Sequence, residues 1–221
     1  MAVSPTVSFE FFPPHSKDAE TQLWNVMEKL APLGPAFFSV TYGAGGSTRS
    51  RTEQLVERIH TSMPVNPAAH LTCVGATQVE IETLAKSWWA AGIRHIVALR
   101  GDPPKGESSY TPHPNGFENA SALVAGLRKI ADFEISVAGY PENHPDSPNQ
   151  SADLDNLKRK VDAGATRILT QYFFDNDLFY RFRDAAAATG ISVPIIPGIL
   201  PVTNFAKVVE FSGKCATTVP T

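Results

Sequence analysis

A single carboxylate interrupts an aromatic stretch near the start of the chain. The stretch reads Val7-Ser8-Phe9-Glu10-Phe11-Phe12-Pro13-Pro14, and its β-prone residues predict a strand that ends at the two prolines. Because burial of an unpaired carboxylate is costly, Glu10 needs either a partner or a function. Aromatic flanks raise a carboxyl pKa, and a raised pKa suits a general acid near neutral pH. The structural alternatives for Glu10 are an inward charge at the mouth of a barrel and a partner for a structural arginine.

Polar side chains also mark the ends of later predicted strands. They are Thr41-Tyr42, His70, Thr72, Arg100, Asp102, Tyr140 and Gln171. The carboxyl ends of parallel strands converge on one face of a (β/α)8 barrel, so this pattern is typical of a barrel active site.

Several of these residues also have a structural interpretation. His70 is more often a satisfied core histidine than a ligand. Arg100-Gly101-Asp102 is either a ligand site, where glycine allows close backbone approach, or a salt bridge within a loop. Gln171 is either a satisfied buried amide or a bidentate substrate contact, and Tyr140 and His144 are consistent with loop packing.

The cationic run Lys158-Arg159-Lys160 is usually a solvated helix face. It gains interest because four side chains fall at i, i+3, i+6 and i+7, and can share one side of a helix: Asp153, Asn156, Arg159 and Lys160. That side offers an acidic group, an amide and cations, which together can hold a sugar hydroxyl and phosphates.

Predicted strands and helices alternate along the whole sequence. Short apolar runs predict strands at 7–12, 37–42, 68–74, 95–99, 133–138, 167–174 and 193–200, each followed by an amphipathic helix. Ser16 is a predicted N-cap, Thr77 and Glu80 form a predicted capping box, and the final helix is expected near Thr203. This alternation predicts a parallel sheet within a single domain, residues 1–221.

Two α/β architectures fit the alternation: a (β/α)8 TIM barrel and an open, doubly wound sheet. The doubly wound nucleotide-binding fold places Gly-x-Gly-x-x-Gly after its first strand, where this chain has Phe-Phe-Pro-Pro. The glycine run at 43–46 lacks that spacing and is interpreted as a flexible loop. We therefore favour the TIM barrel. Because such a barrel takes about 250 residues, we expect a C-terminally truncated chain with seven β–α units visible and the eighth missing.

Composition argues against several other classes of protein. The chain has 221 residues, 43% of them hydrophobic, a net charge of −3 and dispersed basic residues, so a nucleic-acid partner is not expected. Its apolar runs are shorter than the ~20 residues of a membrane helix, and no secretory leader is visible. Two cysteines and no metal-ligand spacing fit a cytoplasmic protein without a metal site. The residues alone thus indicate a barrel enzyme with one buried acid and a site for an anionic, aromatic ligand.

Ordered motifs along nearly the whole chain resemble the methylenetetrahydrofolate reductases of the bacterial, single-domain type. They are Phe9–Pro14, Ser39–Ala44, Ala69–Cys73, Gly92–Asp102, Tyr140–Glu142 with His144-Pro145, Asn156–Ala165 and Pro197–Pro201. Each motif alone is weak, whereas together and in this order they are specific.

The resemblance implies a (β/α)8 barrel that binds FAD without a covalent link. NADH or NADPH would reduce the flavin and depart, and 5,10-methylenetetrahydrofolate would then take a hydride from it to give 5-methyltetrahydrofolate. Glu10 matches the general acid that protonates the folate so that its methylene bridge opens. Asp102 matches the carboxylate near the flavin and the pterin, which would stabilise the resulting cation.

The other matches are binding positions. Gln171 and Phe211 match folate contacts, and Thr41 matches a contact on the nicotinamide side. The positions that match flavin contacts are Tyr42, Ala44, His70, Arg100, Gly101, Ala120, Tyr140, His144, Asp153, Asn156, Arg159 and Lys160. A homo-oligomer is also expected from the resemblance, whereas no residue distinguishes NADH from NADPH.

The sequence departs from the family pattern at several places. Lys207 replaces a glutamine that touches folate in many members, the loop Pro104–Asn115 is longer and carries His113, and Gly45-Gly46-Ser47 replaces a more polar turn. Two alternative functions remain at this stage. One is a non-catalytic flavin- or folate-binding fragment, and the other is a barrel flavoenzyme of the proline-dehydrogenase kind.

Overall fold

The computed structural model describes residues 5–42, 49–103, 106–107 and 109–220. The chain divides into two compact units, Met1–Ile135 and Ser136–Thr221. The division falls within strand β5 (Glu134–Gly139), and each unit is described separately.

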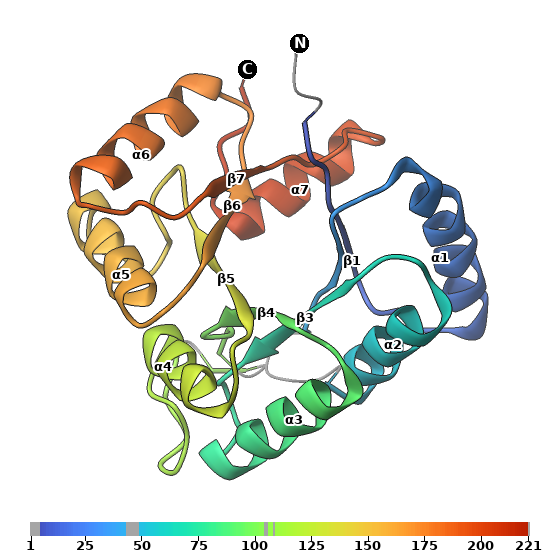
Figure 1. The fold of residues 1–221 in the computed structure, drawn as a ribbon. Coiled ribbons are helices and arrows are strands. Elements are labelled where there is room, and N and C mark those ends of the chain that lie inside the picture. The colour runs from blue at the N-terminus through green and yellow to red at the C-terminus, as the bar shows by residue number, and fades with distance from the viewer. Residues whose placement is uncertain (1–4, 43–48, 104–105, 108, 221) are drawn as a thin grey trace. The chain divides into compact units, whose positions relative to one another are not determined.

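The first unit contains four parallel strands that pair in chain order. They are β1 (Phe9–Phe11), β2 (Phe38–Val40), β3 (Pro67–Thr72) and β4 (His95–Leu99). The α-helices of this unit are α1 (Lys17–Leu30), α2 (Arg49–Ser62), α3 (Gln78–Ala91) and α4 (Ala120–Ile130), and a short 3-10 turn, η1 (Ala31–Leu33), follows α1. Because every strand runs in the same direction, the carboxyl ends of β1 to β4 lie at the same edge of the sheet (Figure 1).

Local capping explains where several of these helices begin. The Ser16 side chain accepts a hydrogen bond from the Ala19 amide at 3.1 Å, as the sequence predicts. Thr77 and Glu80 form the predicted capping box at the start of α3. Gly92 ends α3 with φ +97°, where a Cβ atom would lie 2.8 Å from the ring of His60.

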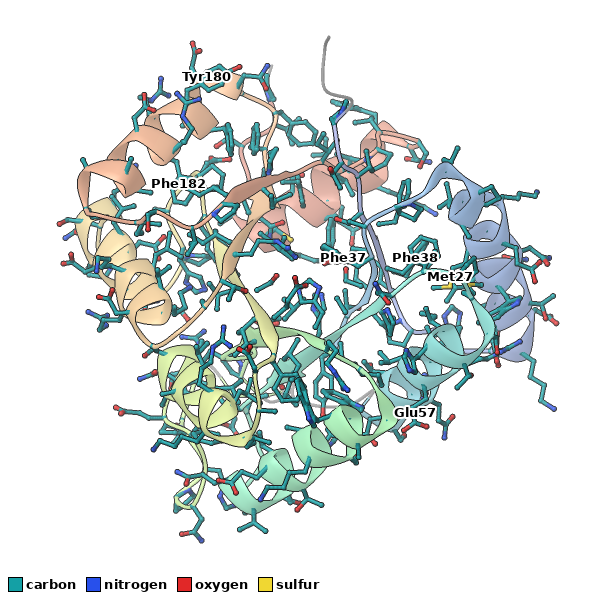
Figure 2. The ribbon with its side chains drawn as sticks, viewed as in Figure 1. Met27, Phe37, Phe38, Glu57, Tyr180 and Phe182 are labelled. Atoms are coloured by element: carbon teal, nitrogen blue, oxygen red, sulfur yellow. The ribbon has the colours of Figure 1, made fainter. Side chains whose placement is uncertain are left out.

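The core of the first unit lies between the helices and the sheet. Met27 of α1 and Phe38 of β2 are fully buried. In Figure 2, Met27 points toward β2 and Phe38 points toward α1, whereas Glu57 lies on the outer side of α2. Ile59 from α2 and Trp88 from α3 are also among the largest fully buried side chains. Complete burial of side chains of this size stabilises the unit by about 1.5–3 kcal/mol each before the cost of chain entropy.

The second unit repeats the same pattern. Strands β5, β6 (Arg167–Tyr172) and β7 (Ile195–Gly198) are parallel and pair in chain order. They alternate with α5 (Gln150–Asp162), α6 (Asn176–Ala188) and α7 (Phe205–Cys215). Phe182 of α6 is buried against this sheet, and Tyr180 of the same helix is exposed (Figure 2).

The predicted α/β class is confirmed, with seven parallel strands alternating with helices in the described residues. The element ends differ from the predictions by a few residues. β1 is shorter than the predicted 7–12 because its pairing with β2 covers only Phe9–Phe11. The last helix begins at Phe205, after the capping side chain of Asn204, close to the predicted start near Thr203. The prediction of one domain remains a prediction, and the glycine run at 43–46 lies outside the described residues.

The described part of the chain has no helix whose length and apolar character would let it cross a lipid bilayer.

Candidate active site

Glu10 lies in the middle of β1 and its carboxylate meets two neighbouring strands. The Ser39 hydroxyl on β2 donates to Glu10 Oε2 at 3.4 Å, and His70 Nε2 on β3 lies 3.2 Å from the same oxygen. The register explains this convergence, because Glu10 pairs with Ser39 across parallel strands. Glu10 therefore has partners, and neither of them is the structural arginine considered from the sequence.

The aromatic neighbours of Glu10 point to the other side of the strand. Phe9 and Phe11 both pack edge-on against Phe38, and their ring centres lie 6.2 Å and 5.2 Å, respectively, from the ring centre of Phe38. Side chains alternate along a strand, so Glu10 faces away from these rings. About half of its side chain, 52%, is exposed to solvent.

The expected rise in the pKa of Glu10 is wrong. Desolvation by burial is the largest single effect and raises this pKa, but three opposing effects together outweigh it. They are the hydrogen bond with His70, the charge of His70, and the hydrogen bond from Ser39, and the net result is a pKa below the ordinary 4.5. Sequence neighbours did not predict this result because the residues that decide it come from adjacent strands.

His70 is a buried side chain that faces this carboxylate. Its side chain is only 7% exposed, and its Nε2 forms no well-aligned hydrogen bond with any described residue despite the short distance to Glu10. Thr72, two positions further along β3, also has a buried hydroxyl with no hydrogen-bond partner among the described residues. Buried polar atoms usually have partners, so these two atoms are candidates for contact with a bound molecule.

The Arg100-Gly101-Asp102 segment follows β4 at the same edge of the sheet. The Nε of Arg100 donates to the Gly101 carbonyl at 3.2 Å, and its guanidinium lies 4.8 Å from the ring centre of Tyr110. Gly101 has φ +90°, and a Cβ atom here would lie 2.6 Å from Val74 Cγ1. Glycine is thus required by local geometry, and Asp102 is exposed beside it.

The remaining predicted positions of the first unit lie at the starts of loops and helices. Thr41 and Tyr42 follow β2 and are half-buried, and the Thr41 carbonyl accepts a hydrogen bond from Thr52 at 2.8 Å. Burial raises the pKa of the Tyr42 hydroxyl far above its ordinary value, so this group is a neutral donor at neutral pH. Ala120 is the first residue of α4. Ala44 lies outside the described residues.

In the second unit, the loop after β5 and the start of α5 are joined. The rings of Tyr140 and His144 meet edge-on at 4.6 Å, and the backbone amide of His144 donates to the Asp153 carboxylate at 3.1 Å. The loop-packing interpretation of Tyr140 and His144 therefore describes a real contact, and it leaves their predicted role in binding untested.

The four predicted residues of α5 do not share one environment. Asp153 and Asn156 are half-buried, Arg159 is exposed and Lys160 is buried. Lys160 Nζ donates to the Ala138 carbonyl of β5 at 2.6 Å. The interpretation of Lys158-Arg159-Lys160 as a solvated run is wrong for Lys160, whose position on the helix turns it toward the strands.

The predicted folate contacts lie on β6 and α7. The Gln171 side-chain carbonyl accepts from the Tyr172 amide at 3.1 Å, so half of this amide is engaged within its own strand. Phe211 stacks on Tyr172 with ring centres 5.9 Å apart and an angle of 15°. Lys207 is exposed one turn earlier on α7. Phe211 and Lys207, at i and i−4, therefore lie on the same side of α7.

Two residues near the candidate site were missed from the sequence. Ser39 was noted only as a strand residue that begins a family motif, although aligning its strand beside that of Glu10 would have placed it in the site. Tyr110 lies in the long loop after β4, which carries no periodic pattern.

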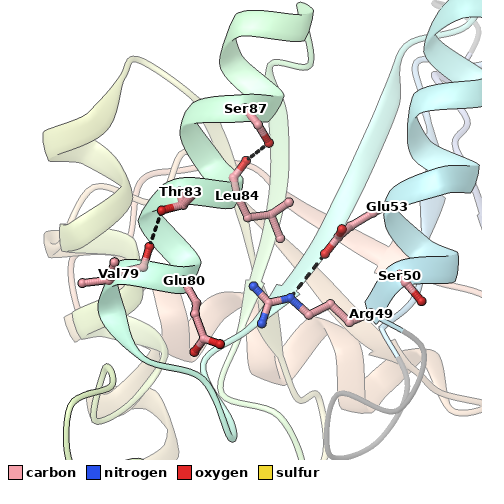
Figure 3. Close-up of a pocket in the computed structure, with 8 residues that line it drawn as sticks. All are labelled: Arg49, Ser50, Glu53, Val79, Glu80, Thr83, Leu84 and Ser87. Atoms are coloured by element: carbon pink, nitrogen blue, oxygen red, sulfur yellow. Dashed lines mark hydrogen bonds and ion pairs between the residues drawn. The ribbon is translucent and has the colours of Figure 1, made fainter.

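Two surface hollows lie away from these side chains. One holds about 610 Å³ between α2 and α3 and is lined by Arg49, Ser50, Glu53, Val79, Glu80, Thr83, Leu84 and Ser87 (Figure 3). The second, of about 370 Å³, is lined by Pro14, His15, Ser16, Glu20, Arg51, Gln54, Leu55 and Arg58. On the α2 side of the first hollow, Arg49 Nε and Glu53 Oε1 form an ion pair at 3.3 Å. Neither lining includes a residue predicted to act in the site, so we do not assign the reaction to them.

Sequence comparison relates the chain to known proteins. The family model described as methylenetetrahydrofolate reductase matches residues 2–221. The 5,10-methylenetetrahydrofolate reductase of Escherichia coli (strain K12) is 50% identical over 214 residues, which cover 97% of this chain and 70% of that protein.

The chain belongs to the methylenetetrahydrofolate reductase family. Methylenetetrahydrofolate reductase (NADH) 1 of Arabidopsis thaliana, another relative, is 40% identical over 224 residues that cover 96% of this chain and 38% of that protein. A solved Clostridium thermocellum protein described as binding two copies of 5-methyl-5,6,7,8-tetrahydrofolic acid has a TM-score of 0.65 at 15% identity, covering 98% of this chain and 73% of that one. Phosphonopyruvate hydrolase gives a TM-score of 0.56 at 14% identity, covering 95% and 78%. These structures support the predicted TIM-barrel class.

The donor set of this reductase-family chain fits a flavin. Among the described residues at the end of β3, Thr72 Oγ1 has no hydrogen-bond partner and His70 Nε2 has only its contact with Glu10, and ring heteroatoms can satisfy buried polar atoms of this kind. Within the described residues there is no cluster of three or more potential metal ligands.

Proposed function

We propose that the protein reduces 5,10-methylenetetrahydrofolate to 5-methyltetrahydrofolate with NADH or NADPH as the electron donor, through bound FAD in a ping-pong cycle. Membership of the reductase family supports the reaction. The observation that carries the chemical assignment is the Glu10 carboxylate at the edge of the sheet, in contact with Ser39 and His70. FAD, when bound, would accept a hydride from the nicotinamide and pass it to the folate.

Glu10 is the proposed general acid. A proton from its carboxyl group would go to the folate nitrogen that leaves the methylene bridge, which opens the bridge to a cation. Asp102 is exposed and carries the negative charge that would stabilise this cation. Positioned general acids contribute roughly 100- to 10,000-fold to the rate of a reaction, so replacing Glu10 should slow the reduction of the folate severely.

The binding roles follow from the family pattern. The proposed folate contacts are Gln171, Phe211 and Lys207, and Thr41 is the proposed nicotinamide contact. The proposed flavin contacts are Tyr42, Ala44, His70, Arg100, Gly101, Asp102, Ala120, Tyr140, His144, Asp153, Asn156, Arg159 and Lys160. A similar fold in a protein described as binding 5-methyl-5,6,7,8-tetrahydrofolic acid supports folate as the substrate class. We also propose a cytoplasmic homo-oligomer.

Two half-reactions test the proposed function. Stopped-flow absorbance should show flavin bleaching with NADH or NADPH, and reoxidation of the reduced flavin by methylenetetrahydrofolate. Glu10→Gln should slow the second half-reaction at least about 100-fold and largely spare the first, because only the folate step needs an acid. Equal losses in both half-reactions would assign Glu10 a structural role, and a protein that takes up no FAD would refute the proposal.

A further inference from the structure

Two side chains converge on a single oxygen of Glu10. Ser39 Oγ lies 3.4 Å and His70 Nε2 lies 3.2 Å from Oε2. Both come from strands, β2 and β3, so their positions are set by the sheet rather than by a loop. This arrangement holds one carboxylate oxygen, Oε2, of a side chain that is 52% exposed.

The surroundings of His70 make Glu10 its ionisable partner in the described part of the chain. The residue beside His70 on β4 is Val97, and β2 contributes the neutral Ser39. Helix α2, which packs on β3, buries uncharged residues: Thr52, Leu55, Val56 and Ile59. Arg100 and Asp102 are the first charged residues after β4 in the sequence. A buried imidazole with one carboxylate within 3.2 Å can exchange a proton with that carboxylate.

We propose that His70 supplies the proton that Glu10 delivers to the folate. The inference rests on the proposed function. In the open site, water reaches the half-exposed Glu10 and solvates its carboxylate. A bound flavin and pterin would cover Glu10 and remove that water, and desolvation penalises the charged pair more than the neutral pair. The proton then moves from His70 Nε2 to Glu10 Oε2.

The step balances in atoms and charge. The N–H bond of His70 breaks with its electron pair left on nitrogen, and an O–H bond forms on Glu10. Rotation of the carboxyl group about its last side-chain bond, a broad torsion, turns the O–H toward the substrate. After Glu10 protonates the folate nitrogen it is a carboxylate again, and the neutral His70 regains a proton from solvent when the site reopens.

This role reconciles the lowered pKa of Glu10 with general acid catalysis. With a lowered pKa, Glu10 is ionised at neutral pH in the free protein and has no proton to give. A proton store in contact with the carboxylate solves this difficulty without a strongly raised pKa. His70 is therefore a positioning residue that acts through Glu10.

The first test compares pH profiles of folate-dependent flavin reoxidation, starting from chemically reduced full-length protein with FAD. His70→Gln keeps an N–H donor but cannot release a proton, and Ser39→Ala removes the other donor to the same oxygen as a matched control. His70→Gln should be at least 10-fold slower than wild type at about pH 8, and the difference should narrow as the pH falls toward about 5.5, because solvent then protonates a growing share of Glu10. Ser39→Ala should change the rate by a similar factor across the whole range.

If His70→Gln is slower than wild type by the same factor at every pH, so that the two profiles are parallel, the inference is overturned and His70 has a structural role. Wild type without any folate-dependent reoxidation would instead refute the proposed function. Recovery of the reoxidation rate at low pH is the specific signature of a missing proton store.

The second test does not depend on turnover, and its main readout uses the wild-type protein. Histidine-labelled full-length protein is followed by ¹⁵N NMR as FAD and then 5-methyltetrahydrofolate are added. The His70 Nε2 signal should move from its protonated to its unprotonated value when both molecules bind, and Glu10→Gln should abolish the change. A His70 signal that stays protonated in the complex would overturn the inference.

Discussion

The guanidinium of Arg100 lies 4.8 Å from the ring centre of Tyr110, which belongs to the long loop between β4 and α4. The Tyr110 hydroxyl is also 3.5 Å from the sulfur of Cys73, just past β3. This loop thus reaches back to two strand ends and holds the side chain of a proposed flavin contact.

Replacement of Tyr110 should affect flavin affinity through Arg100. Tyr110→Ala removes the ring, and because a cation over an aromatic face contributes about 0.5–1 kcal/mol at a partly exposed site, we expect the Kd for FAD to rise about 2- to 5-fold. Tyr110→Phe keeps the ring and should stay near wild type. Fluorescence titration of apoprotein with FAD measures both, and equal weakening by the two variants would show that the Cys73 contact matters instead.

Gly101 is expected to be intolerant of any side chain. Gly101→Ala places a methyl group where a Cβ atom would lie 2.6 Å from Val74 Cγ1 and 3.0 Å from Thr72 Cβ, at φ +90°. The combined strain and overpacking should cost about 2–4 kcal/mol in the free energy of unfolding. Urea unfolding measures this loss, and Gly106→Ala is the matched control.

Gly106 also has a positive φ, +99°, but no atom of the residues that the structure describes lies within 4 Å of its Cβ position. Its replacement should therefore cost only the backbone strain, about 1 kcal/mol. An equal loss for the two variants would mean that the crowding at Val74 and Thr72 relaxes without cost.

Glu10 should add a small, acid-sensitive contribution to stability. A folded-state pKa below the ordinary 4.5 means that the stabilisation is present above this value and is lost as the pH falls through the folded-state pKa. Because about half of the side chain is exposed, we expect no more than about 0.5 kcal/mol. The difference in unfolding free energy between neutral pH and about pH 3.5 should be smaller in Glu10→Gln than in wild type, and an unchanged or larger difference would contradict the lowered pKa.

The sequence was informative wherever a local pattern decides the structure. Ser16, Thr77 and Glu80 cap their helices as predicted because capping is set by neighbouring residues. The pKa of Glu10 was predicted with the wrong sign because His70 and Ser39, which lower it, lie 60 and 29 positions away. Lys160 was misjudged for the same reason, since its acceptor, the Ala138 carbonyl, is on a strand 22 positions earlier.

Lys160 provides a direct test of a buried cation in the second unit. Its ammonium group donates to the Ala138 carbonyl at 2.6 Å, and only 7% of the residue is exposed. Lys160→Met keeps most of the side-chain length but removes the donor, so the loss of this charged hydrogen bond should cost about 1.5–3 kcal/mol, less whatever the apolar replacement recovers. Lys158→Met is the control, because Lys158 forms an exposed pair with Asp162 one turn along α5, and such i,i+4 pairs contribute about 0.3–0.5 kcal/mol. Thermal and urea unfolding should rank Lys160→Met well below Lys158→Met. The reverse order would show that burying the ammonium costs more than its hydrogen bond returns.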